Sequence, residues 1–149
     1  MARAAHRHRC SVLVVDDDRE VHEVLRVALV ASGYDVACVD NARDGLDYLR
    51  SHANTCVVLL DLMLAGMDGA GFRRAQLLDR SLAWIPVVLL SAAVDVTHQA
   101  AEMGARLVLR KPLDLDDLRR AVADATRICR NRPVSDELAT PEGRPLSSG

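Results

Sequence analysis

The sequence predicts an α/β protein, a doubly wound (βα)5 domain built on a parallel sheet. The main observation is a set of five short apolar runs, rich in Val and Leu without polar alternation, at residues 12–15, 36–39, 57–60, 87–90 and 107–109. Such runs are typical of strands that are buried on both faces of a parallel sheet. The second observation is that helical periodicity separates them. Right-handed crossovers would then place helices on both faces of the sheet.

The first two helices are predicted from apolar stripes. One stripe consists of Val21, Val24, Leu25, Ala28 and Leu29, which fall on one face of a helix over about 19–31. Gly33 follows and is expected to end that helix. A second stripe is formed by Ala42, Leu46 and Leu49.

Three further helices complete the pattern. A third helix is expected to begin around Phe72, after a turn that contains Gly66 and Gly69. A weaker fourth helix is predicted over about 95–103, with Gly104 as its stop. The last helix follows the fifth apolar run, and Asp114 is its expected N-cap. Its apolar face is formed by Leu115, Leu118, Val122, Ala125 and Cys129.

Length and composition favour one folded domain over residues 10–130. The chain has 149 residues, half of them hydrophobic and 27% charged. Residues 1–9 are basic and predict a flexible arm, whereas 131–149 hold three prolines and no apolar stripe, as in a disordered tail. The net charge of -2 gives no basic surface for nucleic acid or an anionic membrane. No segment approaches the roughly 20 apolar residues of a membrane span.

The four cysteines predict no metal site or disulfide framework. Cys10, Cys38, Cys56 and Cys129 are scattered and lack C-x-x-C spacing. Cys38 and Cys56 fall in apolar strand-like runs and are interpreted as small core residues. A reducing cytoplasm is the compartment consistent with this pattern.

Acidic side chains follow two of the apolar runs. Asp16, Asp17 and Asp18 come directly after 12–15, and Asp61 comes directly after 57–60. Parallel strands bring their carboxyl ends to one edge of the sheet, where ligands bind in open α/β folds. Three or more carboxylates gathered there repel one another, and their natural partner is a hard divalent cation such as Mg²⁺. Asp18 itself is expected to cap the following helix or to lie in solvent beside the metal site.

Two more strand ends add a hydroxyl and an ammonium group. Ser91 ends the fourth run, and Lys111 follows the fifth. A phosphoryl group on Asp61 would carry negative charge toward Asp16 and Asp17, and Mg²⁺, Lys111 and Ser91 would offset it. These are the parts of phosphoryl transfer to a carboxylate nucleophile.

Each feature also has a plain structural interpretation when taken alone. An acidic triplet after a strand is often only a helix N-terminus. A single Ser91 is uninformative, and a single lysine is usually solvated. Asp68 is interpreted as a turn residue before Gly69. His22, beside the first apolar stripe, is expected to face solvent and not to bind a metal.

Over residues of about 10–130 the chain resembles the receiver domain of two-component response regulators. Four segments carry the resemblance in order: VLVVDDD at 12–18, LLDLMLAGMDG at 59–69, VVLLSA at 87–92 and GARLVLRKP at 104–112. The resemblance implies a flavodoxin-like sheet in the order 2-1-3-4-5 and a cis peptide between Lys111 and Pro112. It also implies that Asp61 accepts a phosphoryl group from a histidine kinase or a histidine phosphotransfer protein.

The resemblance further implies the roles of the neighbouring residues. Asp16, Asp17, Asp61 and the backbone carbonyl of Met63 would hold Mg²⁺. Ser91 and Lys111 would contact the phosphoryl group. We therefore expect a phosphoprotein of phosphorelay signal transduction.

Two positions depart from the family pattern. Ala65 stands where the family usually has a proline, which should loosen that loop without touching the ligands. Val108 stands where the family has an aromatic switch residue. Valine has one stiff χ1 rotamer and lacks the reach of an aromatic ring, so we expect a modest coupling between the acceptor site and the surface near the fifth strand.

The leading interpretation is a stand-alone response regulator, not an enzyme, with output through an unknown protein partner or a phosphorelay. We expect a cytoplasmic monomer or weak dimer that binds neither nucleic acid nor membrane directly. One alternative is a degenerate receiver that serves only as an interaction module, which Val108 mildly favours. The other is a Mg²⁺-dependent aspartyl phosphohydrolase, suggested by Asp16-x-Asp18. Against the hydrolase, Arg19 and Glu20 follow where a small hydroxyl residue is usual, and the chain has no cap insertion.

Overall fold

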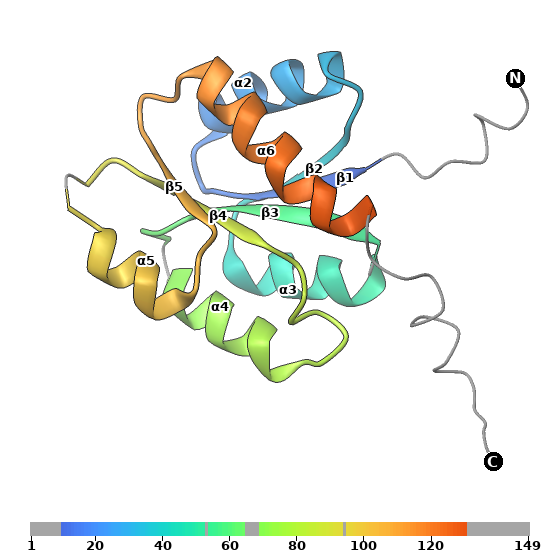
Figure 1. Ribbon diagram of the computed structural model, residues 1–149, viewed down its shortest axis with the longest axis vertical. Helices are drawn as coiled ribbons and strands as arrows, with labels where there is room; N and C mark the ends of the chain where they lie inside the picture. The colour runs from blue at the N-terminus through green and yellow to red at the C-terminus, as the bar shows by residue number, and fades with distance from the viewer. Residues whose placement is uncertain (1–9, 53, 65–68, 94, 131–149) are drawn as a thin grey trace, which may run out of the picture.

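The computed structural model describes residues 10–52, 54–64, 69–93 and 95–130. Five strands form one parallel sheet in the order β2-β1-β3-β4-β5, which confirms the predicted fold class and strand order (Figure 1). The strands are β1 Ser11–Val15, β2 Asp35–Val39, β3 Thr55–Asp61, β4 Val87–Ser91 and β5 Leu107–Arg110. The helices are α2 Arg19–Ala31, α3 Ala42–Ser51, α4 Gly69–Leu78, α5 Thr97–Met103 and α6 Leu115–Arg130.

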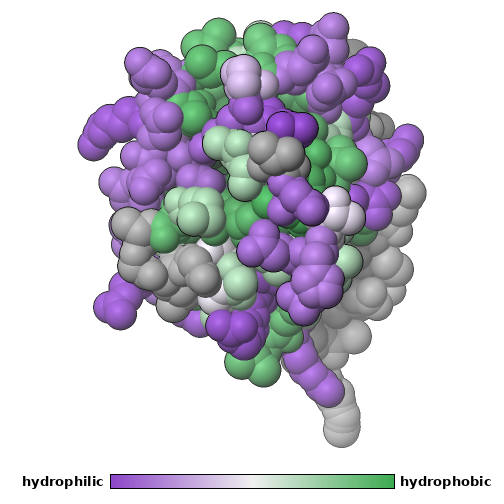
Figure 2. Space-filling view, turned by 90° about the vertical axis from the view of Figure 1, so that its left-hand side faces the viewer, coloured by the Kyte–Doolittle hydropathy of each residue, from purple (hydrophilic) through white to green (hydrophobic). Residues whose placement is uncertain are grey.

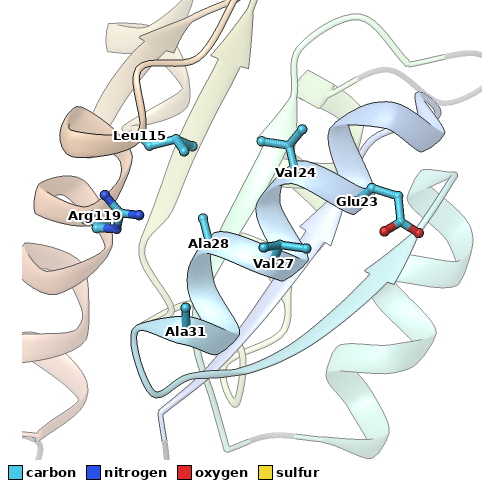
Figure 3. A pocket seen from close by; sticks show the side chains of 7 residues that line it. All are labelled: Glu23, Val24, Val27, Ala28, Ala31, Leu115 and Arg119. Carbon is cyan, nitrogen blue, oxygen red and sulfur yellow. The ribbon is translucent and has the colours of Figure 1, made fainter.

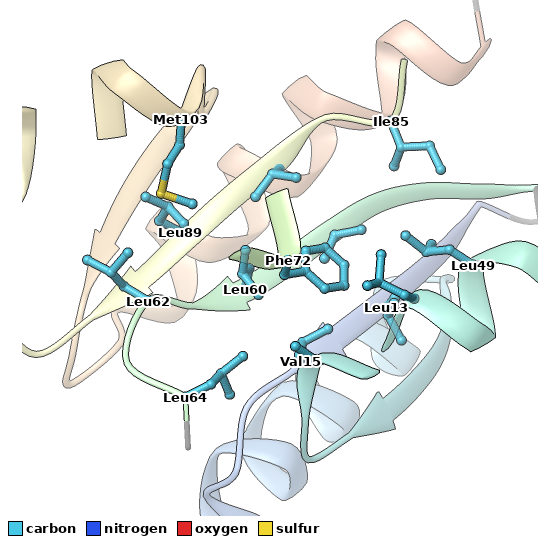
Figure 4. Packing of buried hydrophobic residues seen from close by; sticks show 14 of the residues in the cluster. Leu13, Val15, Leu49, Leu60, Leu62, Leu64, Phe72, Ile85, Leu89 and Met103 are labelled. Carbon is cyan, nitrogen blue, oxygen red and sulfur yellow. The ribbon is translucent and has the colours of Figure 1, made fainter. Parts of the chain in front are cut away.

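Helices cover both faces of the sheet, as Figure 1 shows. Alternate residues of the central strands point to opposite faces. Leu13 of β1 and Leu60 of β3 pack with Phe72 of α4 on the face covered by α3, α4 and α5 (Figure 4). Val14 and Leu59 pack with Leu118 and the other buried residues of α2 and α6 on the opposite face. The core is therefore two apolar layers separated by the sheet.

The expectation that every strand is buried on both faces is wrong for the two edge strands, β2 and β5. The central strands β1, β3 and β4 are fully buried, but β2 and β5 are only partly buried. The reason is topological, because an edge strand has a neighbour on one side only. Cys38, on β2, is accordingly half-buried, whereas Cys56, on β3, is buried as predicted.

The predicted helix ends are confirmed at four places. The Asp18 and Asp114 side chains cap α2 and α6 by accepting hydrogen bonds from the backbone N–H groups of Glu20, Asp116 and Asp117. Gly33 and Gly104 follow α2 and α5 with φ of 97° and 63°, the left-handed conformation that glycine adopts without strain.

The start of α4 was predicted too late. This helix begins at Gly69, and Phe72 lies within its first turn. Gly69 approaches the end of β3 so closely that a Cβ would lie 3.0 Å from the carbonyl oxygen of Asp61. Glycine here serves close packing of helix on strand, so it does not mark the turn that we expected.

Several sequence predictions lie outside the described residues. These are the flexible arm 1–9, the tail 131–149, and the turn and loop features at Ala65, Gly66 and Asp68. None of the helices in the described parts of the chain combines the length and the apolar character that a membrane span requires.

A buried arginine connects three segments on the α4 side of the sheet. Arg73 of α4 donates from Nε to the carbonyl of Met103 at 2.8 Å and from Nη2 to that of Gly104 at 3.2 Å, both at the end of α5. Its Nη1 donates to Oε1 of Gln76, whose amide in turn donates to the carbonyls of Leu82 and Ile85. Burial lowers the pKa of Arg73, and the carbonyl dipoles at the helix end compensate the buried charge.

Replacing Arg73 by methionine should lower the free energy of unfolding by roughly 3 kcal/mol, because buried carbonyls lose charge-assisted donors. Urea unfolding measures this loss. Arg74→Met is the matched control, since the neighbouring Arg74 is exposed, and it should change stability by less than about 0.5 kcal/mol. Equal losses in both variants would contradict the role assigned to Arg73.

Candidate phosphoacceptor site

The parallel sheet brings the predicted site residues to one edge. Asp16 follows β1 directly, and its backbone N–H donates to the carbonyl of Val39 at the end of β2. Asp61 ends β3 and pairs with Leu90, and Ser91 ends β4 opposite Arg110 of β5. This edge faces the viewer in Figure 2, where polar and apolar surface residues are mixed.

Three carboxylates form the centre of the site. Oxygen atoms of Asp16, Asp17 and Asp61 all lie within 4.8 Å of one another. Asp16 is completely buried and Asp61 is 6% exposed, whereas Asp17 is exposed. A group of three carboxylates around an opening to solvent matches the oxygen donors that a hard divalent cation prefers. The cluster predicted from the sequence is therefore present, and its donors fit Mg²⁺.

Lys111 partly balances the charge of these acids. Its Nζ lies 2.8 Å from Oδ2 of Asp16 and 3.6 Å from Oδ2 of Asp61. Burial by itself would lower the pKa of Lys111, but the Asp16 and Asp61 carboxylates outweigh burial and raise that pKa. The peptide bond between Lys111 and Pro112 is cis, as the family resemblance implied. One ammonium against three carboxylates leaves the site negative.

Asp61 occupies the position of the predicted acceptor. Its Oδ1 accepts a hydrogen bond of 3.1 Å from the backbone N–H of Met63, which orients the carboxyl group. Burial raises the pKa of Asp61, and the Asp16 carboxylate raises it further, while the Met63 N–H and Lys111 act in the opposite direction. Oδ2 is thus the oxygen that faces Lys111.

Ser91 is fully buried at the end of β4. Its hydroxyl oxygen accepts a hydrogen bond of 3.0 Å from the backbone N–H of Ala93, and its carbonyl accepts one of 2.8 Å from the N–H of Lys111. The second bond fixes Lys111 beside Ser91 through the backbone. Hydroxyl and ammonium therefore flank the acids on the β4 and β5 side.

His22 does not face solvent as predicted. It is half-buried on the first turns of α2, and its Nε2 lies 2.5 Å from the backbone carbonyl oxygen of Asp16. The side chain reaches back from the helix to the strand end, a contact between residues six apart that the apolar stripe does not reveal. His22 thus supports the backbone of an acidic residue of the site.

An apolar groove opens between α2 and α6, the two helices that begin at the edge carrying the site. It has a volume of about 420 Å³ and is lined by Val24, Val27, Ala28 and Ala31 of α2 and by Leu115 and Arg119 of α6, with Glu23 at its margin (Figure 3). Val24 and Val27 are 48% and 67% exposed. Val24 was assigned from the sequence to the apolar stripe of this helix, and Val27 was not singled out, so the sequence analysis missed this exposed surface.

Comparison with known proteins finds one matching family and many related sequences. A sequence model described as the response regulator receiver domain matches residues 12–123. The response regulator MprA of Mycolicibacterium vanbaalenii is 37% identical over 109 residues, covering 72% of this chain and 46% of MprA. The DNA-binding response regulator MtrA of Mycobacterium tuberculosis is 34% identical over 112 residues, covering 74% of this chain and 47% of MtrA.

Solved structures of response regulators are similar to this chain as well. The response regulator StyR is 29% identical with a TM-score of 0.76, covering 87% of this chain and 65% of the StyR chain. A response regulator receiver protein from Pseudomonas putida is 27% identical with a TM-score of 0.73, covering 79% of this chain and 98% of that one.

Fold, site and comparisons together define a two-component signalling module. The chain belongs to the response regulator receiver domain family. It spans about half the length of the curated relatives that it matches. Phosphorylation on aspartate and Mg²⁺ binding are general features of this family.

Replacing Lys111 by methionine should destabilise the chain by about 3 kcal/mol in the presence of a chelator, because the buried Asp16 carboxylate loses its charge partner. Added Mg²⁺ should recover part of this loss by replacing the missing positive charge. Urea unfolding with EDTA and with Mg²⁺ measures both effects. Arg110→Met, at the exposed neighbouring position, should show neither of them. A loss that Mg²⁺ leaves unchanged would contradict this account of the charge balance.

Proposed function

We propose that this chain is a response regulator receiver that accepts a phosphoryl group on Asp61 in a Mg²⁺-dependent reaction. The observation that carries the proposal is the position of Asp61, within 4.8 Å of the Asp16 and Asp17 oxygens and 3.6 Å from the Lys111 ammonium. The phosphoryl donor is a histidine kinase or a histidine phosphotransfer protein. The location is the cytoplasm, as is typical of the family.

The hydrogen bonds of Asp61 assign a role to each of its oxygens. Oδ1 is held by the Met63 N–H, so Oδ2 is the oxygen that attacks phosphorus. A bond forms between Oδ2 and phosphorus, the bond from phosphorus to the donor imidazole nitrogen breaks, and that nitrogen keeps the electron pair. Lys111 contributes positive charge to the phosphoryl oxygens, and the Ser91 hydroxyl can donate to one of them.

Asp16, Asp17, Asp61 and the backbone carbonyl of Met63 would hold Mg²⁺. The bound ion would neutralise the negative charge that accumulates when a phosphoryl group meets three carboxylates. Asp16 is buried and Asp17 is exposed, so the site would offer the ion one carboxylate on its protein side and one on its solvent side.

The two alternative functions have less support. An interaction module without chemistry would not need a fully buried Asp16 carboxylate paired with the partly buried Lys111, an arrangement that is costly to maintain. Membership of the receiver family disfavours a phosphohydrolase. The chain is therefore not an enzyme in the usual sense, although it can promote its own phosphorylation and dephosphorylation.

Output through protein contacts is part of the proposal. Val108 is half-buried on β5 and packs against the core cluster that contains Phe72. Because valine cannot exchange between an exposed and a buried ring position, we expect a modest response at β5. The partner that receives the signal is a protein of unknown identity or the next member of a phosphorelay, and direct binding to nucleic acid is not part of the proposal.

Incubation with a small-molecule phosphodonor should label the chain stoichiometrically when Mg²⁺ is present. Peptide mapping should place the label on Asp61, and Asp61→Asn should remove it. Asp95→Asn is the matched control, because Asp95 is an exposed aspartate that follows β4 at the same edge of the sheet. Label that survives Asp61→Asn, or that forms equally well in EDTA, would overturn the proposal.

The apolar groove offers a docking surface for the protein donor. A donor must bring its phosphohistidine to Asp61, and its surface then covers the helices that begin at this edge. Val24 and Val27 present apolar area on one side of the groove, and Leu115 presents it on the other. Burying such side chains against a partner stabilises the encounter.

Val27→Ser should slow phosphotransfer from a cognate histidine kinase about tenfold at subsaturating concentrations, because docking loses roughly 1.4 kcal/mol of apolar burial. Labelling by a small-molecule phosphodonor should stay unchanged. Val30→Ser is the matched control, because Val30 is a half-exposed valine of the same helix that does not line the groove. Equal transfer rates for the Val27 and Val30 variants would exclude the groove as the docking surface.

A further inference from the structure

Three of the four cysteines lie at the amino ends of the strands, on the side of the sheet opposite the acidic cluster. Cys10 directly precedes β1, Cys56 lies near the beginning of β3, and Cys129 lies in the last turn of α6. The side chains of Cys129 and Cys10 both act on the pKa of the Cys56 thiol, Cys129 more strongly, so the three side chains are neighbours. Positions 10, 56 and 129 are far apart in the sequence, and only the fold brings them together.

A β-bulge explains how Cys56 reaches α6. Ser11 pairs with Thr55 and Val12 pairs with Val57, so Cys56 is the additional residue on β3. Strict alternation would place Cys56 on the same face as Val58, toward the α3 and α4 side. The bulge breaks this alternation, and the effect of Cys129 on the pKa of Cys56 agrees with a Cys56 side chain on the face where Val57 packs against α6.

The helix presents its cysteine to this position. Val122 and Ala125 form part of the buried stripe of α6. Cys129 lies seven residues after Val122 and four residues after Ala125, so it continues this stripe. Alternation along the first strand places Cys10 on the side of Val12 and Val14, which face α6 as well. The geometry of strand and helix therefore brings the three cysteine side chains to one side of the sheet, in agreement with their effects on the pKa of Cys56.

We propose that Cys56 and Cys129 form a reversible disulfide bond when the chain meets a peroxide. This property is independent of phosphorylation at Asp61, because the two sites lie at opposite edges of the sheet. A disulfide of this kind in a reducing compartment is transient and reports on redox conditions.

The exposures of the two thiols set the order of the chemistry. Cys129 is half-buried and Cys56 is 2% exposed, so the peroxide reaches Cys129 first. The Cys129 sulfur attacks one peroxide oxygen, the oxygen–oxygen bond breaks, and hydroxide leaves and takes the thiol proton as water. The product is a sulfenic acid on Cys129.

Cys56 then resolves this intermediate. Its sulfur attacks Sγ of Cys129, the sulfur–oxygen bond breaks, and hydroxide leaves with the Cys56 proton as a second water. In sum, two thiols and one hydrogen peroxide give one disulfide and two waters. Contact with the Cys129 side chain and burial raise the pKa of Cys56, which disfavours Cys56 as the first thiol to react.

Oxidation should restrain the unfolded chain, because the bond joins the beginning of β3 to the end of α6 and closes most of the folded chain into one loop. The melting temperature should therefore rise on oxidation by several degrees and return when a dithiol reductant is added.

The test uses the full chain, reduced and then treated with hydrogen peroxide. Remaining thiols are alkylated, and peptides are mapped by mass spectrometry without reduction. The expected result is a peptide pair linked between Cys56 and Cys129, which disappears in Cys129→Ser and persists in Cys10→Ser. Cys38→Ser is the matched control, since Cys38 is half-buried on β2, and it should keep the link. Because Cys129 is half-exposed, Cys129→Ser should fold even where Cys56→Ser does not.

Three outcomes would overturn the proposal. In the first, the native chain shows a link between Cys10 and Cys56 while Cys129 stays reduced. In the second, Cys129 is oxidised to sulfinic acid while Cys56 remains a free thiol. In the third, neither Cys56 nor Cys129 is oxidised when the native chain is treated with hydrogen peroxide.

Discussion

The Asp16 carboxylate is fully buried at the end of the central strand β1, and a buried charge of this kind is costly unless it is paired. Lys111 provides this pairing, because its Nζ lies 2.8 Å from Oδ2 of Asp16. Lys111 follows β5, and it can reach the end of β1 because β1, β3, β4 and β5 are successive parallel strands whose carboxyl ends lie on the same side of the sheet. The hydrogen bond from the Lys111 N–H to the Ser91 carbonyl holds the lysine backbone at that place. The chemistry of this edge therefore depends on one ion pair, and the ion pair itself depends on the strand order and on the β5–α6 connection.

The same constraint explains why the site is suited to a cation and a phosphoryl group in turn. One ammonium cannot balance three carboxylates, so the edge stays attractive to a divalent cation. A phosphoryl group on Asp61 would add negative charge to the site, and the Lys111 ammonium and the Ser91 hydroxyl are the groups that can contact it. His22 and the Met63 N–H fix the backbone of Asp16 and the carboxyl group of Asp61, so the acids keep their positions while the charge changes.

The two faces of the sheet are built differently beneath this edge. On one face, the buried Arg73 ties α4 to the end of α5 through carbonyl groups, which links the helices that follow β3 and β4. On the other face, α2 and α6 leave an apolar groove near the site, and the last turn of α6 meets the bulged strand β3 at the cysteine cluster. On one face, the helices are thus joined by hydrogen bonds of Arg73. The other face carries the apolar groove and the cysteine cluster for which we propose a disulfide.

The sequence by itself determined the fold class, the strand order through the family resemblance, and the positions of Asp16, Asp17, Asp61, Ser91 and Lys111. These follow from local patterns, because an apolar run and the polar residue after it are adjacent in the chain. Only the tertiary structure decided the partners of Arg73, the contact of His22 with Asp16, and the meeting of Cys10, Cys56 and Cys129. The reason is physical: each depends on packing between elements distant in sequence, and at Cys56 on a bulge that reverses the face predicted by strand alternation.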